Sequence, residues 1–343
     1  YGDHRDLHLS IRRQRQMCIR DRYIMDYENL KKKLEGCYVT VPTPFKDIKN
    51  LPLNFDALKD YVEFLLSNGL NEENCTLLFG GAAGDFSAMS FDERLSLAKE
   101  SAKIVNGRTP IALGGQTTNT QELEKLANVA KDFGYDFLQV SCPFYFKHTE
   151  DDFIEYVRAA SSAAEGIGII LYNTFWTSTS VSNQLIEKIK DLPNIVGLKW
   201  ATPRTDAMEF EDVTSTYSSR FTIIDNNLFF PYSAMKPLNA KAFEVHMCNF
   251  WPEWGAKLIN EVKKKNFEEI ARMMVEEAMP FYKLWVEIET NFTSGDGYLD
   301  KLCMELVGLP SSRCRPPTRD MREQYRQKTL DYMKKIKVPH LKF

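Results

Sequence analysis

Lys199 is the residue of this sequence with the clearest potential for covalent chemistry. It directly follows the apolar run IVGL (residues 195–198), which has the composition of a buried β-strand. An amine at the end of such a strand loses hydration, and this loss favours its uncharged form. A neutral lysine amine can attack a ketone and form an iminium, which draws electrons from the neighbouring bonds. The position therefore suggests Schiff-base chemistry, although a lysine here could also extend to solvent.

Tyr172 and a glycine-rich turn could supply the other groups that this chemistry requires. Tyr172 ends an earlier apolar run, and a phenol within reach of an iminium can both donate and accept a proton. A core tyrosine bonded to backbone is the plainer interpretation. The segment GGAAGD (residues 80–85) consists mostly of small residues, so its backbone N–H groups could converge on a carboxylate, although such turns more often serve only as tight loops. The candidate carboxylate-binding residues are Gly81, Ala82 and Ala83.

These residues belong to a repeating pattern of short apolar runs and amphipathic stretches. Continuous apolar runs are typical of parallel strands that are covered on both faces, and eight such units in about 220 residues match the size of a (β/α)8 TIM barrel. The alternative, an open doubly wound sheet, usually has a Gly-rich loop after its first strand, whereas this chain has VPTPF (residues 41–45). The predicted strands are Cys37–Pro42, Thr76–Gly80, Ile111–Gly115, Phe137–Ser141, Gly168–Asn173, Ile195–Trp200, Thr222–Asp225 and Ala242–Cys248.

We expect three segments along the chain. Residues 1–24 contain MCIRDR, which resembles the translation of a sequencing-library transposon end, so we expect this segment to be a non-native leader and native sequence to begin near Met25. Residues 25–254 would form the barrel, with helices over Asn54–Ser67, Phe91–Val105, Thr120–Phe133 and Asp151–Ala164. Residues 255–343 would add a C-terminal helical extension with helices over Gly255–Lys265, Phe267–Glu289, Gly297–Val307 and Thr318–Ile336.

Composition narrows the class of protein. The 343 residues are 43% hydrophobic and 27% charged, with a net charge of −3, which indicates a soluble globular protein without a nucleic-acid or anionic-membrane surface. No apolar stretch reaches the roughly 18 residues that a membrane helix requires. The seven cysteines are scattered without zinc-ligand spacing, so we expect reduced thiols, a cytoplasmic location and no metal. No motif for a phosphate-containing cofactor is present, and we expect no cofactor.

Several motifs, in the same order and at similar spacing, resemble the dihydrodipicolinate synthase and N-acetylneuraminate lyase family of class I aldolases. The resemblance extends from about Gly36 to Pro317. The matching elements are Thr43-Pro44-Phe45, the Gly-x-x-Gly-acid turn at Gly81–Asp85, Pro143-x-Tyr145, Tyr172-Asn173, Gly197-Leu198-Lys199-x-Ala201-Thr202, Asn249-x-x-Pro252 and Arg315-Pro316-Pro317.

The resemblance implies a role for several residues. Lys199 would be the Schiff-base residue and Tyr172 the proton shuttle, and Tyr145 stands at the position that in some members reaches the site of a neighbouring subunit. The segment from Gly81 to Ala83 would hold the carboxylate of a small 2-oxo-acid substrate. The resemblance also implies a homo-oligomer, either a dimer or a tetramer.

Two departures from the family pattern bear on the reaction. Ala82 and Ala83 stand where the synthases carry a threonine pair, and Thr174-Phe175-Trp176 follows Tyr172-Asn173 in place of a proline and an arginine. Both changes argue against 4-hydroxy-tetrahydrodipicolinate synthase-like condensation, which stays open as a less favoured reaction. The pattern is closer to the keto-deoxy sugar-acid dehydratases, which use the same iminium to expel a β-hydroxyl. The chain could also be a pyruvate aldolase, or a catalytically silent barrel that binds 2-oxo acids.

Polar or aromatic side chains near the strand ends could bind the part of the substrate beyond its carboxylate and keto group. An aromatic pocket would suit a substrate less polar than a sugar acid, although we expect about half of these aromatic residues to be core. The polar candidates retained as substrate-binding residues are Thr43, Asp225, His246 and Asn249, and Ser141, Asn226 and Glu244 are further possibilities. The aromatic residues are Phe79, Phe86, Phe144, Phe146, Phe175, Trp176, Trp200, Phe250 and Trp251.

Overall fold

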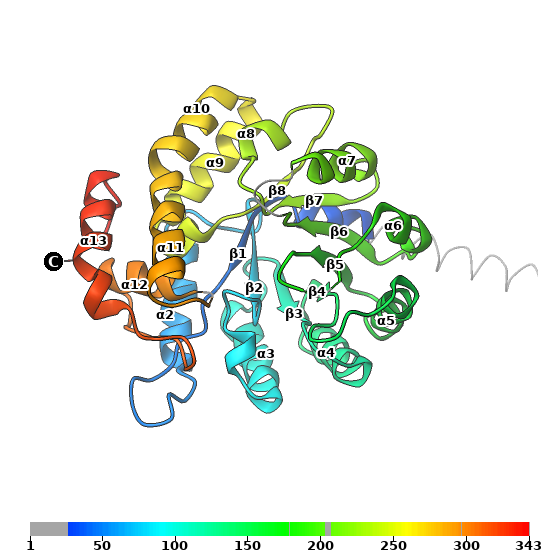
Figure 1. The fold of residues 1–343 in the computed structure, drawn as a ribbon, viewed down its shortest axis with the longest axis horizontal. Coiled ribbons are helices and arrows are strands. Elements are labelled where there is room, and N and C mark those ends of the chain that lie inside the picture. Colours follow the sequence, from blue (N-terminus) through cyan, green and yellow to red (C-terminus); the bar gives the residue numbers. More distant parts are fainter. Residues whose placement is uncertain (1–26, 178, 203–206, 296, 343) are drawn as a thin grey trace, which may run out of the picture.

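Eight parallel strands form a closed barrel in the computed structural model, which describes residues 27–177, 179–202, 207–295 and 297–342 (Figure 1). Each strand pairs with the next, and β1 pairs with β8 to close the ring. The predicted TIM barrel is confirmed, and the predicted leader, residues 1–24, lies outside the described residues. The strands are β1 (Gly36–Thr40), β2 (Cys75–Phe79), β3 (Ile111–Gly114), β4 (Phe137–Ser141), β5 (Gly168–Asn173), β6 (Ile195–Trp200), β7 (Thr222–Asp225) and β8 (Ala242–Glu244).

Helices follow the strands and form the outer layer of the barrel (Figure 1). Local sequence signals fix several of their starts: Ser90 forms a capping box with Glu93, and Asn119 caps the next helix through its side chain. These helices are α2 (Phe55–Ser67), α3 (Phe91–Val105), α4 (Thr120–Asp132), α5 (Glu150–Ala163), α6 (Asn183–Ile189), α7 (Met208–Tyr217), α8 (Phe230–Ser233) and α9 (Pro252–Lys264), with a short 3-10 turn, η1, at Phe86–Ala88.

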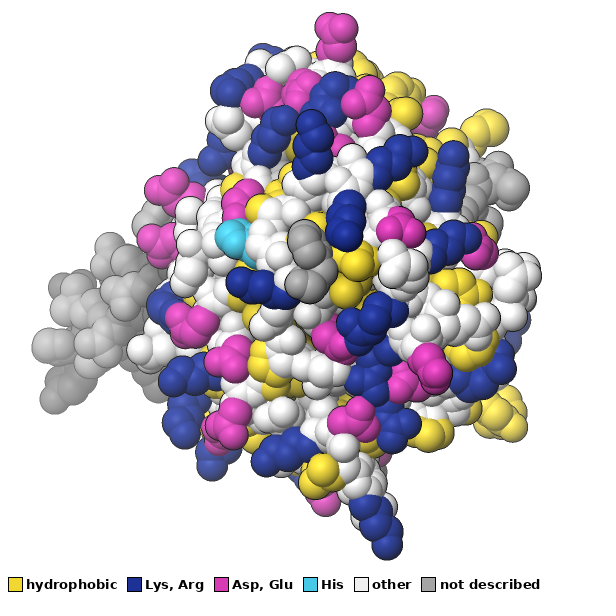
Figure 2. All heavy atoms as spheres, turned by 90° about the vertical axis from the view of Figure 1, so that its left-hand side faces the viewer, with side chains coloured by type: hydrophobic (Ala, Val, Ile, Leu, Met, Phe, Trp, Pro, Cys, Tyr) yellow, Lys and Arg dark blue, Asp and Glu magenta, His cyan; other side chains and the backbone are white. Residues whose placement is uncertain are grey.

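The C-terminal part of the chain is helical, as predicted, and packs along one side of the barrel (Figure 1). The predicted helix Phe267–Glu289 is present with a π-helical segment, η3 (Met273–Ala278), between α10 (Phe267–Arg272) and α11 (Met279–Asn291). The last two helices are α12 (Tyr298–Leu306) and α13 (Arg322–Lys335). Figure 2 shows basic and acidic side chains interspersed on this side of the molecule, without a large patch of one charge.

The predicted eighth strand is too long. Strand β8 ends at Glu244, and His246–Asn249 forms a 3-10 turn, η2, instead of continuing the strand to Cys248. The chain leaves the sheet because the Asn249 side chain, rather than a backbone amide, donates to the carbonyl of Thr40 at 3.0 Å. His246 therefore lies at the start of a turn beyond the strand.

The interior of the barrel is apolar at one end and polar at the other. Residues 27–33 are helical, and Leu34, Phe137 and Val196 belong to a buried apolar cluster near the strand beginnings. The hydroxyls of Thr76 and Thr222, both near the start of a strand, donate to carbonyls of this N-terminal segment, which therefore closes that end. The polar interior residues lie nearer the carboxyl ends of the strands, where barrel enzymes have their active sites.

Candidate active site

Lys199 and Tyr172 lie side by side inside the barrel. They are register partners on β6 and β5, and Lys199 Nζ is 4.5 Å from the centroid of the Tyr172 ring. Both residues are buried, with relative exposures of 4% and 5%. The structure thus brings together the two residues that the sequence singled out, with the amine in the interior and away from bulk solvent.

Glu244, one of the further polar possibilities in the sequence, also belongs to this cluster. Its Oε2 lies 2.6 Å from Lys199 Nζ, and both side chains are almost fully buried. Its Oε1 accepts a hydrogen bond of 2.8 Å from the hydroxyl of Thr40 on β1. A carboxylate within an apolar strand was a usable signal, but the sequence could not show that the side chain faces Lys199 across the barrel.

Tyr38 forms the other side of the amine's surroundings. Its ring centroid is 5.2 Å from Lys199 Nζ, and its hydroxyl donates to Gln139 Oε1 at 3.1 Å. Burial, with Glu244 and Tyr172 as neighbouring acidic groups, raises the pKa of Tyr38 well above its usual value. Tyr38 therefore stays protonated and is a poor proton acceptor, and no local pattern distinguishes it in the sequence.

The glycine-rich turn has the form expected of an anion-binding loop. A Cβ on Gly84 would lie 2.9 Å from the nitrogen of Gly81 and 3.0 Å from that of Gly80, so only glycine leaves these amides uncovered. Gly84 and Phe86 donate to the Gly81 carbonyl and hold the turn in shape. Within the described chain, no protein acceptor takes the amides of Gly81, Ala82 and Ala83.

Thr43 and Asp85 hold this turn in place. The Thr43 hydroxyl donates to the carbonyl of Gly84 at 2.7 Å, and the Thr43 amide donates to Asp85 at 3.2 Å. Asp85 also forms an ion pair of 3.0 Å with Lys301 of α12. Burial raises the pKa of Asp85, and Lys301 opposes that shift. The candidate Thr43 thus supports the turn, and its hydroxyl is already used by a backbone carbonyl.

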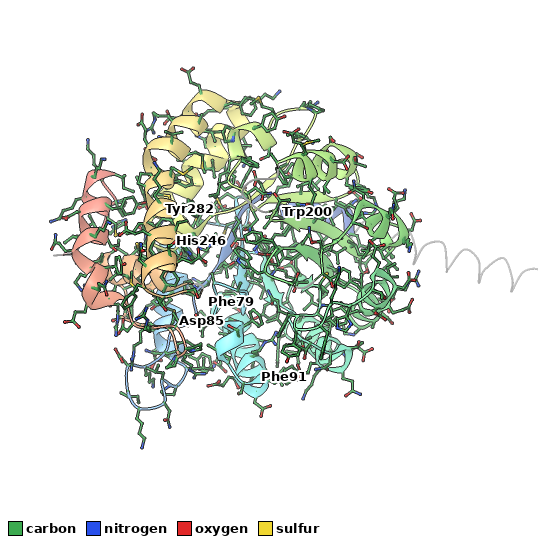
Figure 3. All side chains as sticks on the ribbon, viewed as in Figure 1. Phe79, Asp85, Phe91, Trp200, His246 and Tyr282 are labelled. Carbon is green, nitrogen blue, oxygen red and sulfur yellow. The ribbon has the colours of Figure 1, made fainter. Side chains whose placement is uncertain are left out.

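His246 and Asn249 both contact Asp300, a fully buried carboxylate of α12. His246 Nδ1 is 3.1 Å from one oxygen of Asp300, and Asn249 Nδ2 donates to the other at 3.0 Å. The His246 ring also packs edge-on against Trp285 with a centroid separation of 4.8 Å. Figure 3 shows His246 near Tyr282 of the C-terminal helix α11, and their ring centroids are 6.2 Å apart. A histidine oriented by a carboxylate is a common acid–base arrangement.

Asp225 and Tyr145 lie in different surroundings from this cluster. Asp225 is fully buried at the end of β7, where its oxygens accept from the Asn227 amide and the Ser233 hydroxyl, and burial raises its pKa to about 6. Tyr145 is 84% exposed and has a positive φ of 86°, so within one chain it is not part of the buried cluster around Lys199.

The aromatic candidates separate into core and surface residues. Phe79, Trp200 and Phe250 are buried, whereas Phe144, Phe146, Phe175 and Trp176 are exposed. Phe86 and Trp251 are intermediate. Phe79, Trp200 and Phe250 belong to the core and Trp251 packs against it, so four of the nine are core residues, close to the expected half. The exposed rings lie in the loops after β4 and β5.

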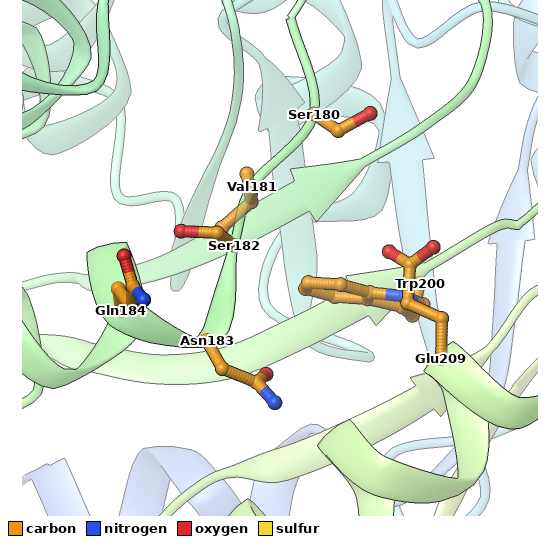
Figure 4. Close-up of a pocket in the computed structure, with 7 residues that line it drawn as sticks. All are labelled: Ser180, Val181, Ser182, Asn183, Gln184, Trp200 and Glu209. Atoms are coloured by element: carbon orange, nitrogen blue, oxygen red, sulfur yellow. The ribbon is translucent and has the colours of Figure 1, made fainter.

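Two cavities lie outside the barrel interior. One of about 460 Å³ is lined by residues 180–184 with Trp200 and Glu209, and Figure 4 shows those two side chains facing the 180–184 segment. A second of about 240 Å³ lies between Phe86, Arg94 and Phe144. Lys199 lines neither of them.

Across the described ranges no three His, Cys, Asp or Glu side chains are grouped as metal ligands, and no helix there is long and apolar enough to cross a membrane.

Comparisons with known proteins identify the relatives of this chain. Residues 33–336 match the sequence profile described as the Dihydrodipicolinate synthetase family. A 4-hydroxy-tetrahydrodipicolinate synthase of Methanocaldococcus jannaschii is 23% identical over 85% of this chain and 95% of the relative. An uncharacterized DapA-like lyase of Pyrococcus furiosus is 27% identical over 81% and 88%.

Solved structures have the same fold. The dihydrodipicolinate synthase of Acinetobacter baumannii, complexed with pyruvate, superposes with a TM-score of 0.76 at 23% identity over 89% of this chain and 99% of its own. The prophage protein YagE of E. coli, also in complex with pyruvate, gives a TM-score of 0.77 at 20% identity over the same shares. At these identities the likeness concerns the barrel and its C-terminal helices.

Proposed function

Because this chain belongs to the Dihydrodipicolinate synthetase family, we propose that it is a lyase that joins Lys199 to a 2-oxo acid as a Schiff base. The observation that carries the proposal is the position of the amine: Lys199 is buried at the carboxyl end of β6 with Tyr172 on the adjacent strand. Two members of the same fold hold pyruvate, which supports a 2-oxo acid as the substrate class.

In this proposal Tyr172 moves a proton at the carbon next to the iminium. The amides of Gly81, Ala82 and Ala83 hold the substrate carboxylate, since no acceptor of the described chain uses them. Asn249 fixes Asp300 and the end of β1, and Thr43 fixes the turn. Asp225 supports the loop after β7.

Among the possible lyase reactions we favour dehydration of a keto-deoxy sugar acid. Loss of a β-hydroxyl requires an acid near the leaving oxygen, and His246, oriented by Asp300, lies just beyond the strand that carries Glu244. The condensation catalysed by the synthases is less favoured because Ala82 and Ala83 lack hydroxyls and Thr174-Phe175-Trp176 carries no cation. A pyruvate aldolase uses the same iminium and remains the second candidate.

An exposed aromatic segment after β4 and the free cysteines bear on the assembly and the location of the protein. Tyr145 is exposed beside Phe146, whose ring centroid is 4.8 Å away, and we propose that this segment contacts a second copy and that the protein is a dimer or tetramer. None of the six described cysteines forms a disulfide, which supports a reducing, cytoplasmic location.

Reductive trapping tests the proposal. The protein is incubated with pyruvate and borohydride, and peptide mass spectrometry is expected to find a reduced pyruvate adduct on Lys199. Lys301 is a second buried lysine, paired with Asp85, and serves as an internal control that should stay unmodified. No adduct on Lys199 would remove the Schiff-base mechanism and leave a silent barrel as the better interpretation. Water loss from keto-deoxy sugar acids, compared with pyruvate release from 4-hydroxy-2-oxo acids, then separates dehydratase from aldolase.

A further inference from the structure

We propose that Glu244 is a catalytic residue that takes a proton from Lys199, returns it to the departing water and then balances the charge of the iminium. The inference rests on the proposed function, because it concerns the formation of the same Schiff base. It starts from one contact: Glu244 Oε2 lies 2.6 Å from Lys199 Nζ, with relative side-chain exposures of 6% and 5%.

A buried ion pair at this position is costly for the fold. Removing two charges from water costs several kcal/mol each, and an apolar pair of similar volume often gives equal or greater stability. The surroundings would accept an apolar pair in place of Lys199 and Glu244, because Ile224 and Ala242 occupy neighbouring interior positions on β7 and β8. The carboxylate is therefore better explained by chemistry at the amine than by packing.

The two oxygens of Glu244 have different surroundings. Oε1 accepts a hydrogen bond of 2.8 Å from the Thr40 hydroxyl, which fixes the orientation of the carboxylate. Oε2 faces the Lys199 amine as its ion-pair partner, and no other group among the described residues contacts it as a hydrogen-bond partner. One oxygen is thus held by the protein, and the other is available to the proton of Lys199.

The neighbouring groups are less suited to this role. The hydroxyl of Tyr38 donates to Gln139, and its raised pKa makes its phenolate inaccessible. Lys199 Nζ lies over the face of the Tyr172 ring, 4.5 Å from its centroid. Among the described residues, Glu244 is the one ion-pair partner of Lys199.

The proposed sequence balances protons and charge. The Lys199 ammonium gives one proton to Glu244, and the freed lone pair attacks the carbonyl carbon while the C–O π electrons move to oxygen. A second Nζ proton moves to that oxygen and gives a neutral carbinolamine. Protonated Glu244 then protonates the hydroxyl, the C–O bond breaks, water leaves and the nitrogen lone pair forms the iminium. Glu244 ends as a carboxylate beside the cation, so one water is the only product released.

The test compares Glu244→Gln, Glu244→Asp and wild type in reductive trapping with pyruvate. Glutamine keeps an oxygen for Thr40 but cannot accept a proton, so a purely structural role would survive this change. We expect E244Q to trap pyruvate roughly 100-fold more slowly at neutral pH, with a rate that rises steadily with pH because solvent must now take the proton. E244D keeps a carboxylate and is expected to keep the pH profile of the wild type with a reduced rate.

Glu261→Gln is the matched control. Glu261 is another largely buried glutamate, paired with Lys264 at 2.9 Å on α9, and this change should leave trapping unaltered. A wild-type adduct on Lys199 together with an unchanged rate and pH profile in E244Q would overturn this inference alone. Absence of the wild-type adduct would overturn the proposed function and this inference with it. Circular dichroism spectra confirm that each variant is folded.

Discussion

Asp85 and Lys301 join the glycine-rich turn after β2 to helix α12 through a buried ion pair of 3.0 Å. The side chains are 3% and 1% exposed, and the amine also lies 4.6 Å from the ring centroid of Phe45. The C-terminal helices thus act directly on the candidate carboxylate site, because the residue that shapes the turn is held by a residue more than two hundred positions later in the chain.

Removing one member of this pair should destabilise the protein. We expect Lys301→Met to lower the free energy of unfolding by about 3–5 kcal/mol, because Asp85 would remain buried without a counter-charge. Denaturant unfolding measures this change. The double variant Asp85→Asn with Lys301→Met should lose less free energy of unfolding than the two single variants added together, because the two residues are paired. The exposed pair Lys188–Asp151 is the control, and Lys188→Met should change the midpoint little.

Replacing Tyr172 should separate adduct formation from turnover. Tyr172→Phe keeps the ring next to Lys199 but removes the hydroxyl that we propose as the proton shuttle. We expect the variant to retain trapped adduct while kcat falls roughly 100-fold. Steady-state rates and adduct mass are measured on the same preparation, and turnover equal to that of the wild type would exclude the shuttle role.

Replacing His246 should slow the loss of water from the substrate but not the formation of the Schiff base. His246→Asn leaves the Lys199–Glu244 pair intact, so pyruvate trapping should be close to that of the wild type. Water loss from a keto-deoxy sugar acid should slow by roughly 100-fold, because the acid for the leaving hydroxyl is lost. Asp300→Asn, which removes the charge facing His246 Nδ1, should give a smaller loss of the same step. If trapping and water loss fell together, His246 would have a general structural role instead.

Between about pH 4 and pH 6, the free energy of unfolding should change as the Asp225 carboxyl titrates. Burial raises the Asp225 pKa from 3.8 to about 6, so the folded state binds a proton more readily than the unfolded state. The cost of keeping this carboxyl ionised is present in full above pH 6 and disappears as the pH falls toward 4. At neutral pH this cost is about 3 kcal/mol.

Asp225→Asn tests this dependence. In the wild type, protonation of Asp225 should raise the free energy of unfolding as the pH falls from 6 to 4, and the variant should lack this gain. Denaturation midpoints of wild type and variant across that pH range measure the difference. The comparison is necessary because ion-paired carboxylates such as Glu93 and Glu269, whose pKa values are lowered, lose stability as the pH falls. Parallel curves for the two proteins would contradict the prediction.

The barrel could be predicted from the sequence because each strand is a local apolar run. Strands β4, β5, β6 and β7 begin and end where the patterns place them. The error at β8 has a non-local cause, since the strand ends where the Asn249 side chain takes the Thr40 carbonyl. No property of residues 242–248 alone reveals that contact.

The candidate site was predictable in part for the same reason. Lys199 and Tyr172 are the second-last residues of neighbouring strands, so their proximity follows from the fold. Glu244 meets Lys199 in the barrel interior and accepts from Thr40, and predicting this requires knowledge of which residues of β1 and β8 point inward. Asp300 and Lys301 come from a helix whose position no local pattern defines.

Residues 27–34 close the end of the barrel where the strands begin. Leu34 lies against Gly197 beneath the amine's strand, and Thr76 and Thr222 tie residues 31–33 to two strand beginnings. In the proposed reaction, the 2-oxo acid would therefore enter and the product would leave at the carboxyl ends of the strands. Departure of one molecule has to precede arrival of the next, so a product that lingers would act as a competitive inhibitor of its own formation.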